Sequence, residues 1–141
     1  MKVSDAMTSQ VSVARPGDSI RKVAEVMAKV DSGVVPVVED GKVLGLVTDR
    51  DIVLRVVAEG KGLETPVSEV MTEGVETCRE DDNVADATGK MGAKQIRRLV
   101  VLNESGKMAG ILSLGDVAVD YGAKAVGKTL GEISENTPSA H

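Results

Sequence analysis

The chain of 141 residues is long enough for one domain or two half-size units, and it carries a net charge of −5. It has no Trp or Phe and a single Tyr, so it lacks both the aromatic platforms and the basic surface typical of nucleic-acid-binding proteins. One cysteine, Cys78, and one histidine, His141, argue against a disulfide, a histidine-based triad and a histidine metal cluster. No apolar run could span a bilayer and the N-terminus lacks a signal-peptide core, so we expect a cytoplasmic protein.

The first half of the chain predicts a strand, a helix, a hairpin and a second helix. Residues 11–14 alternate as a short strand, and "RPGD" then turns the chain so that Asp18 can cap a helix. The apolar positions of this helix recur at spacings of three and four, at Ile20, Val23, Ala24, Met27 and Val30. The strands at 34–39 and 42–48 flank Asp40-Gly41, a tight-hairpin signal. Helical spacing then returns at Ile52, Val53, Val56 and Val57.

The second half of the chain repeats the first. "VSDAMT" at 3–8 matches "VSEVMT" at 67–72, an offset of 64, and after the predicted hairpin loops "EDGK" and "NESGK" the offset becomes 65. We therefore expect an α+β protein of two β-α-β-β-α repeats, residues 1–62 and 63–128, that pack together. Residues 129–141 are expected to form a partly disordered tail.

One short pattern follows the hairpin in both repeats: "GLVTDRDI" at 45–52 and "GILSLGDV" at 110–117. A hydroxyl residue, Thr48 or Ser113, stands where strand passes into helix, and Asp51 or Asp116 comes three residues later. The spacing fits a capping box. It also fits a nucleotide site, because helix N-termini attract phosphate and an aspartate can accept both ribose hydroxyls. The short Asp, where capping boxes prefer Glu or Gln, favours the nucleotide site.

These features resemble a tandem pair of CBS domains, the regulatory modules first named in cystathionine β-synthase, and in particular small stand-alone bacterial CBS-pair proteins. The resemblance rests on "DAMT", "EVMT", the glycine-to-aspartate pattern and "QIRRLVVLNESGKMAGILSLGDVAV", and covers about residues 1–125. It implies repeats packed through their sheets about a pseudo-twofold axis, and a homodimer. It also implies clefts between the repeats for an adenosine-containing ligand (AMP, ADP, ATP or S-adenosylmethionine), with no cofactor required.

The resemblance assigns ligand contacts position by position. Asp51 and Asp116 match ribose-binding aspartates, while Thr48 and Ser113 match hydroxyls near the ribose or phosphate. The segments at the base and phosphate, and the wall over the base, match Ser32, Gly33, Val34, Ile96, Arg97, Arg98, Ser12, Val13, Thr77 and Ile111. Because aromatic rings are missing, aliphatic side chains would have to hold the adenine through dispersion and buried area.

Differences between the repeats predict unequal sites. Arg97 and Arg98, which suit phosphate, stand where the first repeat has glycine and valine. Gly115 would allow a ligand close to the backbone, whereas Asp49 in the first repeat would repel phosphate. We therefore expect the site at Asp116 to dominate for phosphate-bearing ligands.

The sequence thus predicts a ligand-sensing module without catalysis that relays occupancy to an unknown partner protein. A ligand-free structural or dimerisation module, whose capping boxes only cap helices, is the main alternative, and a nucleic-acid-binding regulator is a weaker one. The homodimer is expected to bury the apolar stripes after each motif, Ile52, Val53, Val56 and Val57, and Val117, Ala118 and Val119. No membrane association is expected.

Overall fold

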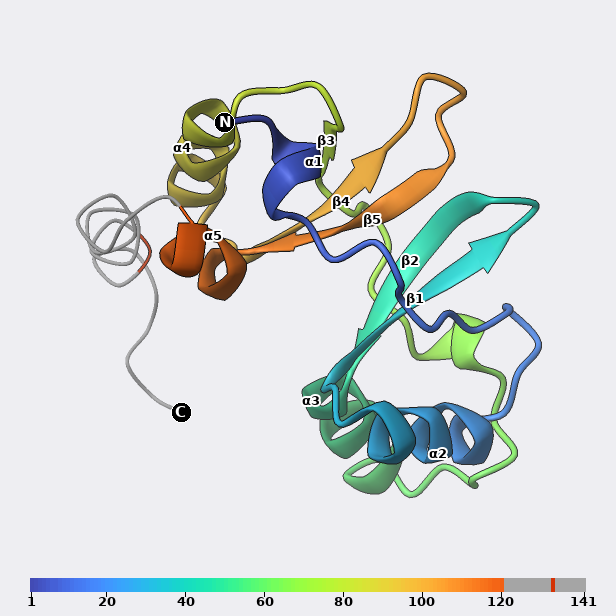
Figure 1. Cartoon of the computed structure of the whole chain (residues 1–141). Helices are drawn as coiled ribbons and strands as arrows, with labels where there is room; N and C mark the ends of the chain where they lie inside the picture. The colour runs from blue at the N-terminus through green and yellow to red at the C-terminus, as the bar shows by residue number, and fades with distance from the viewer. Residues whose placement is uncertain (121–132, 134–141) are drawn as a thin grey trace. The chain divides into compact units, whose positions relative to one another are not determined.

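The computed structural model describes residues 1–120 and 133, and the chain divides into two compact units (Figure 1). Unit 2 is the continuous segment Val11–Val75, whereas unit 1 combines Met1–Gln10 with the chain from Glu76 onward. The two units have mixed helices and strands with two small sheets, which confirms the expected α+β class. Tyr121, His141 and the predicted tail, apart from Ile133, lie outside the described residues.

Unit 2 contains the predicted hairpin between two helical segments. Helix α2 (Ile20–Val30) precedes strands β1 (Val34–Glu39) and β2 (Lys42–Thr48), which pair antiparallel. Asp40 and Gly41 turn the hairpin with φ of 53° and 79°, the left-handed pair that a tight hairpin requires. Helix α3 (Asp49–Ile52), the π-helical turn η1 (Val53–Val57) and the 3₁₀ turn η2 (Val67–Glu69) follow.

The core of unit 2 lies between α2, the hairpin and η1. Buried residues of these elements include Ile20, Val37, Val47 and Val56, all at 1% exposure or less. The helical stripe is narrower than predicted, because Ala24 and Val30 are exposed. Met27 is buried, as expected for a methionine that fills core space.

The start of α2 differs from the prediction that Asp18 caps it. Ser19 is the N-cap, and its hydroxyl accepts the backbone N–H of Lys22. Asp18 instead closes the "RPGD" turn, where its carboxylate accepts the backbone N–H of Arg15 at 2.8 Å and pairs with Lys22. Ser19 thus accepts a backbone N–H of the helix, and Asp18 accepts a backbone N–H of the turn.

The predicted strand at residues 11–14 is reduced to one bridge, from Ala14 to Val37. Ala14 donates to the Pro36 carbonyl and accepts from Val38. The next bond toward the N-terminus would need a donor from Pro36, which has no N–H, so the ladder stops. In the second repeat Val100 takes the place of Pro36 and donates to Glu76, and a strand forms there.

Unit 1 holds a three-stranded sheet within the described residues. Strand β3 (Thr77–Arg79) runs parallel to β4 (Arg98–Leu102), which pairs antiparallel with β5 (Met108–Ser113). Helices α1 (Val3–Ala6), α4 (Val84–Lys94) and α5 (Leu114–Asp120) accompany this sheet. Its core includes residues from all of these elements and from the predicted tail: Val3, Cys78, Met91, Leu99, Leu112, Val117 and Ile133.

Each sheet is extended by the "MT" dipeptide that begins the opposite repeat. Thr8 pairs with Ile111 on β5, and Thr72 pairs with Leu46 on β2, each through reciprocal backbone hydrogen bonds. The glycine of the repeated motif, Gly45 or Gly110, lies against the backbone of this added segment. A Cβ on Gly45 would come within 2.7 Å of the Thr72 carbonyl oxygen, and one on Gly110 would clash with the Thr8 carbonyl. The repeated glycine is therefore explained by close backbone approach.

Candidate functional site

The repeated motif forms a complete capping box in the first repeat. The Thr48 hydroxyl accepts the Asp51 backbone N–H at 3.1 Å, and Asp51 Oδ2 accepts the Thr48 backbone N–H at 2.9 Å. The shorter Asp therefore makes the return bond, so its length is no argument against a capping box. The capping bond uses one carboxylate oxygen, so capping by itself leaves the other oxygen for a different partner.

Arg55 is that other partner of Asp51. Its guanidinium lies 3.8 Å from Asp51 Oδ1, and it donates to the carbonyls of Val70 at 2.8 Å and Met71 at 3.2 Å. Arg55 therefore ties η1 to the segment that extends the sheet of unit 2. Both oxygens of Asp51 are thus engaged within the protein.

The turn before β1 lies against the start of α3. Asp49 donates its backbone N–H to the Gly33 carbonyl at 2.9 Å, and its carboxylate covers Gly33, where a Cβ would lie 2.8 Å from Oδ2. Ser32 closes the turn by hydrogen bonds with both backbone groups of Val34. The turn at Gly33 and the start of α3 are thus neighbours, but the negative Asp49 carboxylate lies against Gly33, which disfavours phosphate there.

Within the described residues, the capping box of the second repeat leaves one oxygen of its aspartate without a partner, unlike the box of the first repeat. Asp116 donates its backbone N–H to the Ser113 hydroxyl at 3.1 Å, and its Oδ2 accepts the Ser113 N–H at 3.3 Å. Thr8, from the opposite end of the chain, also donates to Oδ2, at 3.4 Å. Within residues 1–120 and 133, Asp116 Oδ1 has no hydrogen bond or ion pair, so one oxygen of this half-buried carboxylate is open to a ligand.

Two arginines lie next to this carboxylate's helix. Leu114 donates its backbone N–H to the Arg97 carbonyl at 2.9 Å, so the start of β4 and the start of α5 are adjacent. Arg97 and Arg98 are exposed, and neither guanidinium has a partner in the part of the chain that the structure describes. Gly115 is exposed, and a Cβ there would make an ordinary contact with the Ser113 hydroxyl at 3.7 Å. No carboxylate takes the place of Asp49 here, so the cationic charge is uncompensated.

The remaining predicted residues differ in their location and in their exposure to solvent. Thr77 and half-buried Ile96 lie in unit 1, Thr77 on β3 opposite Val100. Ile111 is only 7% exposed beneath Thr8, so it offers little surface for a base. Ser12 and Val13 are exposed just before the Ala14 bridge in unit 2. Ser12 and Val13 thus lie in the same unit as Asp51, and Thr77, Ile96 and Ile111 lie in the same unit as Asp116.

Sequence reasoning missed Thr8, Arg55, Lys90 and Lys94. Thr8 was missed because a local pattern does not reveal which strand a distant segment pairs with. Arg55 stands four residues after Asp51, and this i,i+4 spacing could have indicated the ion pair. The two lysines could have been found by comparing the repeats, since they replace Val26 and Val30 at the offset of 64.

Outside the two motifs, the described residues offer few groups suited to catalysis or metal binding. Burial raises the pKa of the Cys78 thiol to about 11, with a smaller contribution from Asp82, so this thiol is not an activated nucleophile. A polar hollow of about 490 Å³ lies at the opposite end of the unit 1 sheet, between Arg79 and the 102–105 hairpin. No cluster suited to a metal ion occurs among residues 1–120 and 133. None of the described helices has the length and hydropathy to cross a membrane.

Comparisons with known proteins bear on the family and the fold. The family model described as "CBS domain" matches residues 3–58 and 67–120. The CBS domain-containing protein YhcV of Bacillus subtilis is 39% identical over 133 residues, 94% of each chain. A crystal structure of the CBS domain protein PAE2072 from Pyrobaculum aerophilum, complexed with AMP, is 25% identical at a TM-score of 0.77, covering 93% of this chain and 99% of that one.

A second solved structure is similar to the same extent. The CBS domain pair of protein MJ0100, in complex with 5-methylthioadenosine and S-adenosyl-L-methionine, is 26% identical at a TM-score of 0.75. The match covers 88% of this chain and 98% of that chain. Both similar structures therefore match a tandem pair of repeats over almost their whole length.

Proposed function

Because the chain belongs to the CBS domain family, we propose that it is a regulatory module that binds an adenosine-containing ligand and relays its occupancy to a partner protein. Members of this family are typically regulatory modules, and the similar pairs PAE2072 and MJ0100 are complexed with AMP and with S-adenosylmethionine. The ligand would be AMP, ADP, ATP or S-adenosylmethionine. The module would act in the cytoplasm as a homodimer, without catalysis of its own.

The single observation that carries the proposal is the open oxygen of Asp116. A carboxylate that caps a helix with one oxygen and presents the other can accept a ribose hydroxyl without losing its structural role. The exposed Arg97 and Arg98 stand beside the same helix start and can bind phosphate. Ribose and phosphate recognition thus have separate groups at one place.

The site at Asp116 is proposed as the tighter one for nucleotides. At Asp51 a ligand must compete with Arg55 for the second oxygen and must approach the Asp49 carboxylate. Neither obstacle exists at Asp116. The site at Asp51 would therefore suit a ligand whose group near Asp49 is uncharged or cationic.

Signalling would follow from a population shift. A ligand that binds one conformation of the module better than others raises the population of that conformation, and a partner protein can detect this shift. The ligand-free alternative is favoured by one observation, namely that both capping boxes are complete without a ligand. Binding measurements separate the two possibilities.

The decisive variants are Asp116→Asn and Asp51→Asn, because asparagine keeps one carbonyl oxygen for the cap while it removes the carboxylate. For Asp116→Asn we expect AMP affinity by calorimetry to fall about tenfold or more, equivalent to roughly 1.5–3 kcal/mol. Asp51→Asn should leave the tighter site intact. Arg97→Gln should weaken AMP more than adenosine.

Two outcomes would contradict these assignments. If Asp51→Asn removes the tighter site while Asp116→Asn has no effect, the assignment of the two sites is reversed. If no adenosine compound binds the unmodified protein at millimolar concentration, the ligand-sensing function is wrong and the structural alternative holds.

A further inference from the structure

The two repeats differ in charge at four positions between the middle of the longer helix and the start of the next strand. At the offset of 64, four cationic residues of the second repeat correspond to uncharged residues of the first: Lys90, Lys94, Arg97 and Arg98 correspond to Val26, Val30, Gly33 and Val34. Val30 is 45% exposed, so the face that is cationic in unit 1 presents an apolar side chain to solvent in unit 2. The packing of the fold does not require lysines there, since the first repeat builds the same helix without them.

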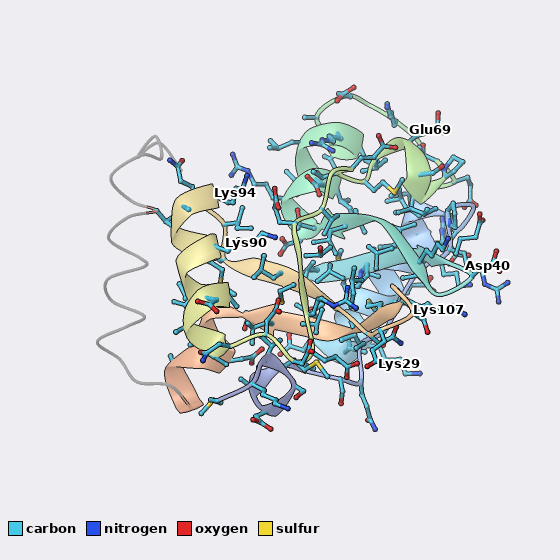
Figure 2. All side chains as sticks on the ribbon, turned by 90° about the horizontal axis from the view of Figure 1, so that it is seen from above. Lys29, Asp40, Glu69, Lys90, Lys94 and Lys107 are labelled. Carbon is cyan, nitrogen blue, oxygen red and sulfur yellow. The ribbon has the colours of Figure 1, made fainter. Side chains whose placement is uncertain are left out.

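Contacts place these cations at one end of the unit 1 sheet. Lys90 and Lys94 lie one turn apart on the same side of α4 (Figure 2), 3.6 and 3.9 Å from the two oxygens of Glu76. Lys90 also donates to the Thr77 carbonyl at the start of β3. Because β3 is parallel to β4, this is the end at which β4 begins with Arg98.

The same end of the sheet carries the proposed ribose and phosphate groups. Arg97 contacts the start of α5 through Leu114, and α5 carries Asp116. The cationic face, defined as Lys90, Lys94, Arg97 and Arg98, therefore lies beside the proposed nucleotide site. Among the described residues, Glu76 is the carboxylate that pairs with this face, through Lys90 and Lys94, so one negative charge faces four positive charges and Arg97 and Arg98 are in no ion pair.

We propose that Lys90 and Lys94 form a subsite for the outer phosphates of a polyphosphate chain, so that the module prefers nucleoside di- and triphosphates to monophosphates. This rests on the proposed nucleotide site at Asp116. Arg97 and Arg98 suffice for a first phosphate, and each further phosphate adds a negative charge that needs another cation. Lysine suits this position, because a flexible ammonium can leave Glu76 and follow a phosphate oxygen.

Glu76 acts in the subsite as an internal substitute for phosphate. It is half-buried and holds both lysines while no anion is present. A polyphosphate must displace it, so removing its charge should strengthen anion binding. If the ion pair were purely structural, the loss of the Glu76 charge would leave the affinity for anions unchanged.

The experiment measures inorganic tripolyphosphate and, separately, adenosine, AMP, ADP and ATP by calorimetry in magnesium-free buffer. Tripolyphosphate is the probe for the subsite, and adenosine is the probe for the proposed function. For Lys94→Gln and Lys90→Gln we expect tripolyphosphate and ATP to bind about three- to tenfold more weakly, with adenosine unchanged. Glu76→Gln should bind tripolyphosphate about three- to tenfold more tightly.

Lys29→Gln and Lys107→Gln are the matched controls, since both lysines are exposed and neither contributes to the cationic face (Figure 2). Both controls should leave all affinities unchanged. The subsite is disproved if ATP binds no more tightly than AMP, or if the control lysines weaken tripolyphosphate as much as Lys94→Gln does. A protein that binds adenosine but fails either comparison retains the proposed function without the subsite. One that binds tripolyphosphate as described but no adenosine retains the subsite alone.

Discussion

One aspartate in each of the turns before α2 and α4 stabilises the fold by accepting a backbone hydrogen bond. Asp18 accepts the Arg15 N–H, and Asp82 accepts the Arg79 N–H at the equivalent place in the second repeat. The backbone N–H of Arg15, followed by Lys22, holds the pKa of the Asp18 carboxyl below its ordinary value. A carboxyl whose pKa is lowered in the folded state stabilises that state when it is ionised.

Asp18→Asn should therefore lower the free energy of unfolding by about 0.5–1 kcal/mol at pH 7. The difference from the unmodified protein should shrink as the pH falls below about 4, where the unfolded chain and then the folded protein take up the proton. Urea unfolding at pH 7 and pH 3 measures both values. Asp81→Asn, at an exposed neighbour of Asp82, is the control, and an equal loss there would show that general charge is responsible.

The repeated glycines make a second residue-scale prediction. Gly45→Ala and Gly110→Ala place a methyl group against the backbone of the crossing segment, so each should destabilise the protein by about 2 kcal/mol or more. Gly89→Ala, in the open middle of α4, should instead stabilise it by up to about 1 kcal/mol. Thermal unfolding of the three variants measures whether each substitution raises or lowers the stability. A neutral Gly110→Ala would mean that Thr8 does not pair tightly with β5.

At the scale of elements, the ends of α2 and α4 share an unusual feature. Both helices end in a left-handed residue that is not glycine, Asp31 with φ of 53° and Gln95 with φ of 58°. Glycine is the usual residue here, and a negative charge at a helix C-terminus opposes the helix dipole. Each of these residues precedes a predicted ligand segment, at Ser32 and at Ile96. Strain of this kind is often tolerated next to binding residues.

Asp31→Gly should stabilise the protein by about 1 kcal/mol, because it removes both the left-handed strain and the unfavourable charge. That corresponds to a rise of about 4 °C in Tm. Asp31→Ala, which removes the charge but keeps the strain, should give a smaller gain or a loss. Differential scanning calorimetry compares the two, and equal gains would show that the charge alone matters.

The elements also show how far sequence reasoning reaches. The hairpin at Asp40-Gly41, both long helices and the two capping motifs were predictable, because each depends on residues close together in the chain. The strand at 11–14 was wrong, because one proline in a neighbouring strand, Pro36, withholds the hydrogen bond it needed. The grouping of Arg97 with Asp116 was predicted through the resemblance, whereas the hydrogen bond from Thr8 links residues 108 positions apart and has no local signal.

At the scale of the whole molecule, the exposed apolar residues favour association. Val53, Leu54 and Val57 in and next to η1 are 55%, 48% and 67% exposed, which agrees with the idea that this segment faces another chain. The predicted stripe was partly wrong, because Val56 and Val117 are buried in the cores of their own units and cannot contact a partner. The side chain of Val119 lies outside the described residues.

We predict a homodimer that depends on this apolar face. Leu54→Glu and Val57→Glu should convert it to a monomer, because each would bury an unpaired carboxylate in the interface. Light scattering at micromolar concentration measures the mass. Leu63→Glu, at a similarly exposed leucine in the segment 59–66 between the two repeated motifs, should leave the dimer intact. A monomeric unmodified protein would refute the prediction.

Because each repeat pairs with the first segment of the other repeat, the order of synthesis sets the order of folding on the ribosome. Val11–Val75 is one uninterrupted stretch and can complete its fold while the second half is still being synthesised. Residues 1–10, although synthesised before unit 2, have to wait for β5, where Thr8 pairs with Ile111 next to Gly110. This segment is thus among the last to fold, and its buried side chains, Val3 and Ala6, stay exposed to chaperones and proteases until then.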